Sequence, residues 1–479
     1  MNMADLQLAL PEMFIAVMAC TLLVADLFIP EARRGLTHTL ALITLAFATV
    51  ITLRMLSPAG PTESVLFDTF TRDRFGDVLK LFSYLILFAV FIYAKHYLRM
   101  AGLFRGEFYT LSLFALLGVM VMISAGSLLT VYLGLELLAL SSYALVALNR
   151  DSARGSEAAM KYFILGSLAS GILLFGMSLI YGATGTLALS DISASLADAA
   201  GDQALLAFGL AFIVVGIAFK LGAVPFHMWL PDVYQGAPAA ISLLIASLPK
   251  LGYLALVIRL LDNGMSDLHS DWQAMLVVLA ALSMVLGNVV AIAQSNFKRM
   301  LGYSTISHVG FILMGVLAAS PEGYAAAMFY TIVYAMMSAG AFAVMILLSN
   351  DGIEAEHLED FKGLARRSPW FALIMLMLMF SLAGIPVFVG FFAKWQVIAA
   401  AMGAGYTGLA VLAVITAVIG AFYYLRVVKL IYFDEPGDSE PVDAPVDFKA
   451  VLSINGLAMI LLGLFSGGLI SLCLSSFGS

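Results

Sequence analysis

Charged residues are scarce in this chain. Only 11% of the 479 residues are Asp, Glu, Lys or Arg, whereas soluble domains carry about 25%. Because 62% of the residues are hydrophobic, a soluble fold would have too little polar surface to cover its core. The composition therefore excludes a soluble enzyme and a disordered chain. The net charge of −7 also argues against a nucleic-acid partner, which requires a basic face.

Cysteine is nearly absent as well. Cys20 and Cys473 lie in apolar stretches near opposite ends of the chain, so they form neither a metal-ligand set nor a disulfide framework. We interpret both as small core residues. The chain also lacks GxxxxGK[ST] and any GxGxxG that follows a strand, so no nucleotide-binding motif is present. We expect no metal, cofactor or redox centre in this chain.

Long apolar runs are abundant. A bilayer core needs roughly 20 apolar residues per helix, and runs of that length are too long for barrel strands. We therefore predict an all-α polytopic membrane protein without a soluble domain. The first apolar segment has no basic leader and contains Glu12, so we expect it to be retained as a span. The predicted spans number about fourteen: 6–28, 37–57, 75–96, 108–125, 127–148, 158–182, 204–226, 236–262, 272–294, 300–318, 323–349, 370–399, 404–432 and 450–474.

The distribution of Lys and Arg predicts the orientation. With fourteen spans, fifteen of the 24 cations fall in the loops that follow odd-numbered spans and in their flanks. Five fall on the other side, and four lie within spans. Because cytoplasmic loops carry the excess of Lys and Arg, we expect both termini on the periplasmic side of the bacterial inner membrane.

Two ionisable residues are predicted deep in the first half of the chain. Glu136 lies about ten residues into the fifth span, with no polar neighbour in the sequence. Lys220 precedes Pro225 by five residues, and proline interrupts a helix. His227 follows the predicted break. An amine, an imidazole and an interrupted helix together are typical of a hydrated ion site, because freed backbone groups must face protein or water.

Two further lysines lie deep in later spans. Lys250 follows Pro249 near the centre of the eighth span, roughly 15 to 20 Å from either surface at 1.5 Å per residue, so its side chain cannot reach water. Lys394 follows a second predicted helix break at Gly384-Ile385-Pro386. Trp395 beside it leaves two alternatives open, an interior amine or one in the interfacial belt.

A buried charge at mid-membrane costs at least a few kcal/mol, so each of these residues needs a reason. Burial disfavours the charged form of an amine or a carboxyl, and a nearby opposite charge favours it. A lysine beside a glutamate can therefore hold a proton while the pair is closed and release it when the pair opens. Arginine cannot do this, because it does not deprotonate.

Two features allow alternative interpretations. Lys161 and Glu157 are four residues apart on one helical face. They form either a surface pair or a pair from which Lys161 reaches Glu136 or the Lys220 region. His308, in YSTISHVGFILMG, either bridges two lysine sites or is a satisfied buried histidine.

Several motifs carry a family resemblance. FKLGAVPFHMWLPDVYQGAP, SLPKLG, NFKRMLGYSTISHVG and the lone glutamate of LTVYLGLELLALSSYAL together resemble the antiporter-like membrane subunits of respiratory complex I, which are related to Mrp-type antiporter components. The likeness covers nearly the whole chain. Within the family the chain is most similar to the bacterial N-type subunits, because it lacks a long C-terminal lateral helix and has Lys394 where M-type subunits carry glutamate.

The resemblance implies a particular architecture. Spans 4–8 and 9–13 would form two inverted five-helix repeats, with discontinuous helices at spans 7 and 12. The chain would then divide into an N-terminal three-helix segment (1–107), a first repeat (108–262), a second repeat (263–432), and an acidic loop with a C-terminal helix (433–479). We find no residue-level repeat between the halves.

The resemblance also implies a mechanism. Glu136 and Lys220 would form the controlling ion pair, Lys250 the central relay and Lys394 the carrier in the exit half-channel. His227, His308 and Lys161 would be further relay residues. NADH, FMN, iron–sulfur clusters and quinone would be bound by partner subunits. The expected partners are the M- and L-type subunits, the small K-, J- and A-type subunits, the H-type subunit, and the lipid bilayer.

Three functions compete at this point. The first is a proton-translocating membrane-arm subunit of NADH:quinone oxidoreductase, and the second is a subunit of an Mrp-type Na+/H+ antiporter. The third, a scaffold, ranks last because deep ionisable residues are costly there.

Overall fold

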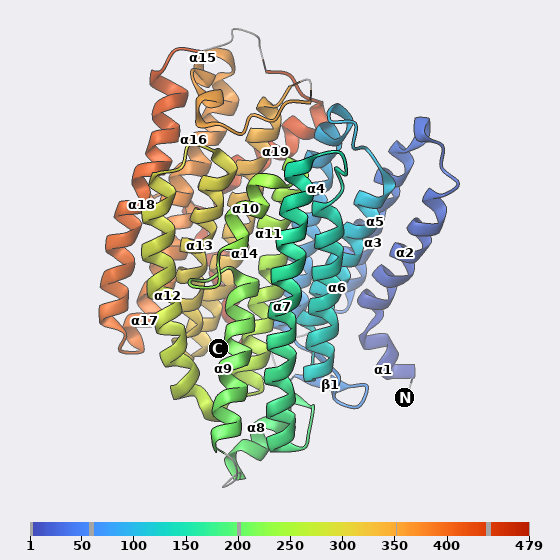
Figure 1. Cartoon of the computed structure of the whole chain (residues 1–479), viewed down its shortest axis with the longest axis vertical. Helices are drawn as coiled ribbons and strands as arrows, with labels where there is room; N and C mark the ends of the chain where they lie inside the picture. The colour runs from blue at the N-terminus through green and yellow to red at the C-terminus, as the bar shows by residue number, and fades with distance from the viewer. Residues whose placement is uncertain (1–2, 57–61, 199–202, 351, 437–441, 479) are drawn as a thin grey trace.

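The computed structural model describes residues 3–56, 62–198, 203–350, 352–436 and 442–478. The chain forms a bundle of long, roughly parallel helices (Figure 1). The elements of the first half are α1 (Met3–Leu8), α2 (Leu10–Asp26), η1 (Glu31–Arg33), α3 (Gly35–Arg54), β1 (Glu63–Val65), β2 (Phe70–Arg72), α4 (Arg74–Met100), α5 (Gly106–Ile123), α6 (Leu128–Val146), α7 (Ala153–Thr184), α8 (Leu189–Asp198), α9 (Gln203–Leu221), α10 (Trp229–Gly236), α11 (Ala239–Val257) and η2 (Ile258–Asn263).

The second half consists of helices alone in the described residues. Its elements are η3 (Ser266–Leu268), α12 (His269–Ile292), α13 (Phe297–Val316), α14 (Pro321–Leu348), η4 (Leu358–Phe361), α15 (Leu364–Arg367), α16 (Pro369–Ala383), α17 (Val389–Gly403), α18 (Thr407–Phe433), α19 (Val446–Leu464) and α20 (Ser466–Leu474).

Among the described residues, eleven helices are long and apolar enough to cross a membrane. The prediction of a polytopic helical membrane protein is therefore confirmed. The predicted spans 6–28, 300–318 and 370–399 lie outside these eleven but are also helical, as α2, α13 and the pair α16–α17. The narrow split between spans 4 and 5 is real, because α5 ends at Ile123 and the Ser127 hydroxyl accepts the amide of Thr130 to begin α6.

The expectation of a purely helical chain misses one small feature. Glu63–Val65 pairs antiparallel with Phe70–Arg72 in a two-stranded hairpin between α3 and α4. The backbone of this connection has no helical partner for its amides, and strand pairing satisfies part of them. The hairpin lies at the same end of the bundle as α8, opposite α15 (Figure 1).

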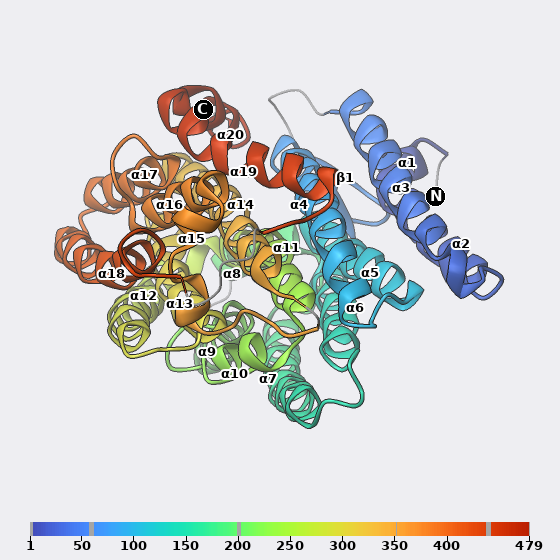
Figure 2. The ribbon, with the colours of Figure 1, turned by 90° about the horizontal axis from the view of Figure 1, so that it is seen from above.

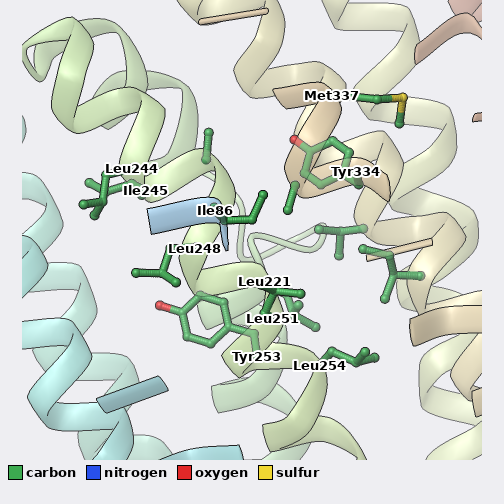
Figure 3. Packing of buried hydrophobic residues seen from close by; sticks show 14 of the residues in the cluster. Ile86, Leu221, Leu244, Ile245, Leu248, Leu251, Tyr253, Leu254, Tyr334 and Met337 are labelled. Atoms are coloured by element: carbon green, nitrogen blue, oxygen red, sulfur yellow. The ribbon is translucent and has the colours of Figure 1, made fainter. Parts of the chain in front are cut away.

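Helix α11 lies at the centre of the bundle. Viewed from above, α11 and α14 lie inside, with α2 and α3 at one edge and α12 and α18 at the other (Figure 2). Every residue of α11 is buried, and the helix packs against α4, α5 and α14. Its leucines Leu244, Leu248 and Leu251 pack among buried neighbours that include Leu221 of α9 and Tyr334 of α14 (Figure 3). A polar group on α11 is therefore far from lipid and must find its partner inside the protein.

Candidate proton-transfer site

Both predicted helix breaks are present, and they have the same local structure. Helix α9 ends at Leu221 before Gly222 (φ +80°), and α16 ends at Ala383 before Gly384 (φ +84°). In each case the next amide bonds back five residues, from Ala223 to Ala218 O at 2.8 Å and from Ile385 to Phe380 O at 3.0 Å. This is the glycine-terminated helix cap that requires a left-handed residue. The prolines at 225 and 386 follow three and two residues later.

At each break a lysine amine donates hydrogen bonds to carbonyls at the end of the interrupted helix. The Nζ of Lys250 donates to Leu221 O at 3.3 Å, and Leu221 is the last residue of α9. The Nζ of Lys394 donates to Leu382 O at 3.0 Å and to Ala383 O at 2.9 Å, at the end of α16. The last carbonyls of a helix lack intrahelical donors and form the negative end of the helix dipole, so they favour a cation.

The first break carries a second amine with a carboxylate partner. Lys220 lies on the last turn of α9, is 3% exposed, and donates to the hydroxyl of Ser170 on α7 at 2.8 Å. Its Nζ is 4.0 Å from Oε1 of Glu136 on α6. Glu136 is partly exposed, and its buried Oε1 has no hydrogen-bond partner. The pair is therefore in contact but open, without a direct hydrogen bond between its members.

Lys250 and Lys394 differ from Lys220 in having no ion-pair partner within the described parts of the chain. Lys250 is 1% exposed, and its amine donates its one described hydrogen bond to the Leu221 carbonyl. Lys394 lies 5.3 Å from the centre of the Phe311 ring and points inward, whereas Trp395 beside it is 59% exposed. Of the two alternatives for Lys394, the structure supports the interior amine.

His308 belongs to a hydroxyl cluster rather than to a direct bridge between lysines. Its Nδ1 lies 2.7 Å from the hydroxyl of Tyr330 on α14, and its Nε2 lies 3.0 Å from the hydroxyl of Tyr424 on α18. The Tyr424 hydroxyl also bonds Ser304. Phe311, one turn further along α13, contacts both the His308 ring and the Lys394 amine. The imidazole is satisfied and buried, and it lies beside the second break.

Lys161 lies in a surface network. Its Nζ is 2.7 Å from Glu157 and 3.0 Å from Asp232 of α10, and it is 44% exposed. Asp232 also pairs with Arg299 of α13 at 2.6 Å. Lys161 forms none of its described bonds with Glu136 or Lys220, so the surface pair is the alternative that the structure supports. His227 lies in the first break, and its buried Nδ1 has no hydrogen-bond partner.

The sequence analysis missed several buried ionic groups, and two of them contain lysines. In the first, the Nζ of Lys80 lies 2.7 Å from Glu12, and the neighbouring Asp77 pairs with Arg72 at 3.2 Å. In the second, Lys298 lies 2.5 Å from Glu354 and is 2% exposed. The orientation count places Lys80 and Lys298 among the cations of the loops and their flanks, not among the four that lie within spans. An acid inside the first span and the Asp77–Lys80 spacing of three residues were the available signals for the first group.

The geometry is suited to moving protons rather than to binding a metal. Within the ranges that the structure describes, no group of three His, Cys, Asp or Glu side chains could hold a metal ion. The ionisable groups at the two breaks are instead three amines and one imidazole that bond helix carbonyls or hydroxyls, and one carboxyl that faces the Lys220 amine. Each can exist with or without its proton, and burial makes the neutral amine accessible.

Comparisons with known proteins agree with this geometry. Residues 125–420 match the family model described as NADH:quinone oxidoreductase/Mrp antiporter, TM. The chain is 56% identical over 469 residues to NADH-quinone oxidoreductase subunit N of Thioalkalivibrio sulfidiphilus, covering 98% of this chain and 97% of that protein.

Solved structures share the fold. A chain of respiratory complex I from Thermus thermophilus is 32% identical with a TM-score of 0.82, covering 96% of this chain and 98% of that chain. A chain of the Mrp complex from Dietzia sp. is 23% identical with a TM-score of 0.85, covering 98% of this chain and 97% of that chain. At that lower identity the likeness concerns the fold alone.

Proposed function

Because the chain belongs to the NADH:quinone oxidoreductase/Mrp antiporter membrane family, we propose that it is a proton-translocating subunit in the membrane arm of NADH:quinone oxidoreductase. The extent of the likeness supports this function, since relatives with this name align over nearly their whole length. In this role the chain moves protons across the membrane while other subunits carry out the redox reaction.

The topology we propose has fourteen spans, with two inverted repeats at spans 4–8 and 9–13 and both termini on the periplasmic side of the bacterial inner membrane. The excess of Lys and Arg on the side of α15 and the α13 N-terminus supports this orientation. The two glycine-capped breaks support the repeats, because each predicted repeat contains one.

The proton path we propose runs through Glu136 and Lys220, then Lys250, then the His308 cluster, and leaves through Lys394. When Lys220 and Glu136 close, the pair favours the protonated amine; when they separate, Lys220 releases its proton toward Lys250. Lys250 and Lys394 hold a proton only against helix carbonyls, so each passes it on readily. Water would connect these groups where side chains do not touch.

This proposal rests on one observation: a lysine amine donates hydrogen bonds to the last carbonyls of each interrupted helix. Lys250 lies on Leu221 O, and Lys394 lies on Leu382 O and Ala383 O. A lysine that only filled space would not be held at both interrupted helices by the backbone groups that the interruption frees. The partial negative charge there stabilises a proton without fixing it as a carboxylate would.

The redox chemistry belongs to partner subunits in this proposal. NADH, FMN, iron–sulfur clusters and quinone would be bound by partner subunits, and the M-, L-, K-, J-, A- and H-type subunits would be the partners in the membrane arm. The comparison with a chain of a whole respiratory complex supports partners of this kind. An Mrp-type antiporter subunit is the weaker alternative, because the likeness to the Mrp chain is limited to the fold.

The test uses the assembled complex in sealed membrane vesicles. Lys250→Met is expected to lower proton pumping by roughly 100-fold, the scale of a lost proton-transfer group, while the complex assembles. Lys429→Met is the matched control, because Lys429 is 63% exposed and pairs only with Asp434 at the surface. Normal pumping in an intact Lys250→Met complex would refute the proposal.

A further inference from the structure

Helix α11 has no N-cap side chain of its own at the turn that joins it to α10. Helix α10 ends at Gly236 and α11 begins at Ala239, with Ala237 and Pro238 between them. Pro238 occupies the position before α11, where a Ser, Asp or Asn would normally accept a first-turn amide. The proline offers no side-chain oxygen, so the first amides of α11 need an acceptor from elsewhere.

That acceptor is Glu354, which lies more than a hundred residues away in the sequence. Its Oε1 accepts the backbone amide of Ala239 at 2.9 Å and also the hydroxyl of Tyr97 on α4. Its Oε2 pairs with the Nζ of Lys298 at 2.5 Å. Lys298 in turn donates to Ala237 O at 2.8 Å. One ion pair from outside therefore holds both sides of the turn, its carbonyl and its amide.

The same turn of α13 holds α10 at further points. Arg299, next to Lys298, pairs with Asp232 at 2.6 Å and bonds Gln235 at 3.2 Å. Phe297, on the other side, donates its amide to Glu356 O at 2.6 Å, which fixes the loop that carries Glu354. The first turn of α13, helix α10 and residues 352–357 thus form one connected unit, which we call the joint clamp.

The joint clamp is positioned to control the distance between the amines of Lys220 and Lys250. Lys220 lies at the end of α9, just before the break and α10, whereas Lys250 lies three turns into α11. The only described bond of the Lys250 amine reaches back to Leu221 O, at 3.3 Å. Helix α11 continues from its first turn through Pro249 to Lys250, so a shift or tilt at the first turn moves the Lys250 amine relative to that carbonyl.

Burial separates this ion pair from the surface pair beside it. Lys298 is 2% exposed and Glu354 is 19% exposed. Glu356, on the same loop, also forms a two-pronged pair with Arg154 of α7, at 2.7 and 3.0 Å. Its carboxylate is 16% exposed, but Arg154 is half-exposed, and this pair bonds neither α10 nor α11. A solvent-exposed pair contributes little, whereas removing one partner of a buried pair leaves an uncompensated charge.

We propose that Lys298 and Glu354 are positioning residues that hold the α10–α11 turn and thereby set the distance between the end of α9 and Lys250. This inference rests on the proposed function. It predicts that the pair controls how many protons are moved for each NADH oxidised, without taking part in proton transfer itself.

The experiment compares matched variants in the assembled complex. Glu354→Asp keeps the charge but shortens the side chain by about 1.5 Å, so it should assemble while releasing the Ala239 amide. We expect the protons pumped per NADH to fall at least about threefold, because a displacement of about 1 Å at a reacting group can cost up to 100-fold. Glu359→Asp makes the same change five residues away, on a side chain that is 78% exposed and pairs with Lys362, and should leave the ratio unchanged.

Two further measurements separate positioning from simple damage to the fold. Hydrogen exchange at the Ala239 amide should be roughly fivefold faster in Glu354→Asp, the scale expected when a helix loses its cap, and unchanged in Glu359→Asp. The double variant Lys298→Met/Glu354→Gln should pump better than either single neutral variant, because it leaves no unpaired buried charge. A general loss of stability would make the double variant the worst of the three.

The outcomes separate this inference from the proposed function. If Lys250→Met abolishes pumping while Glu354→Asp shows normal pumping per NADH and normal exchange at Ala239, the clamp is refuted and the proposed function stands. If Lys250→Met pumps normally, the proposed function fails. Exchange at Ala239 would then still report whether Glu354 holds the turn.

Discussion

The two broken helices end alike but bind their lysines differently. Both α9 and α16 stop at a left-handed glycine, and both offer their last carbonyls to an amine. At the first break a carboxylate, Glu136, also faces an amine, Lys220, at 4.0 Å. At the second break Lys394 bonds two carbonyls and faces the Phe311 ring, and it has no carboxylate partner in the part of the chain described.

This difference determines what each break can do with a proton. The first break can remain neutral overall with a protonated lysine, because Glu136 supplies the opposite charge. The second break gains a full positive charge whenever Lys394 is protonated, balanced only by backbone dipoles and an aromatic face. A proton should therefore be retained at the first break and released more readily at the second.

The largest expected effect removes the carboxylate that distinguishes the first break. Glu136→Gln should lower proton pumping by roughly 100-fold, as expected when a proton-transfer pair is lost, with the complex still assembled. The measurement is pumping in sealed vesicles alongside NADH oxidation. Glu359→Gln is the control, because Glu359 is exposed and pairs only with its neighbour Lys362. Equal pumping in the two variants would remove the distinction between the breaks.

Replacing Gly222 or Gly384 by alanine tests whether the two breaks position different residues. In Gly384→Ala the new Cβ would lie 2.8 Å from Cδ and 3.3 Å from Nζ of Lys394, whereas in Gly222→Ala it would meet Leu230 at 2.4 Å. Both variants should lose roughly 1–2 kcal/mol of stability, because the left-handed conformation strains alanine.

Only Gly384→Ala should also displace a proton carrier, so we expect its pumping per assembled complex to fall roughly tenfold, within the range that misplacement of a reacting group produces. Gly403→Ala, with no atom near its new Cβ, is the control. If Gly222→Ala lowers pumping per assembled complex more than Gly384→Ala does, the claim that only the second glycine positions a proton carrier is contradicted.

A smaller effect is expected at the histidine near the second break. Tyr424→Phe removes the hydroxyl that His308 Nε2 contacts at 3.0 Å, which leaves a buried ring nitrogen unpaired at a cost of about 1–3 kcal/mol. We expect pumping to fall about fivefold, corresponding to about 1 kcal/mol, in pumping assays at fixed NADH. Tyr181→Phe changes an exposed tyrosine and serves as the control. Unchanged pumping in Tyr424→Phe would exclude His308 from the path.

The smallest expected effect is at Lys161. Its pairs with Glu157 and Asp232 are half-exposed, and such pairs contribute about 0.2–1 kcal/mol. Lys161→Met should therefore change pumping less than about fivefold, the ratio to which 1 kcal/mol corresponds. A loss as large as that in Glu136→Gln, measured in parallel, would assign Lys161 to the proton path.

The sequence predicts the breaks better than it predicts the contacts made there. Proline and glycine mark both interruptions, because their effect on the backbone is local. The partner of Lys250 is a carbonyl 29 residues earlier, and His308 meets Tyr424 from 116 residues away. Neither contact follows from hydrophobic periodicity, which defines the buried face of a helix but not its neighbour.

Lys394 and Glu354 illustrate the same limit. Trp395 made an interfacial position for Lys394 as reasonable as an interior one, and only the packing of α16 against α17 resolves its direction. Glu354 lies in a polar loop, where an acidic residue is normally solvated, and its pairing with Lys298 depends on how that loop crosses the ends of α13 and α11. These outcomes depend on tertiary contacts.

The claim that these lysines gain and lose a proton is tested most directly by Lys250→Arg in the assembled complex, with protons pumped per NADH as the readout. Arginine keeps a positive charge near Leu221 O but does not release its proton. We expect pumping to be as low as in Lys250→Met, although the charge is retained. Pumping at the level of the unaltered complex would mean that a fixed cation suffices at this position, which would contradict the mechanism.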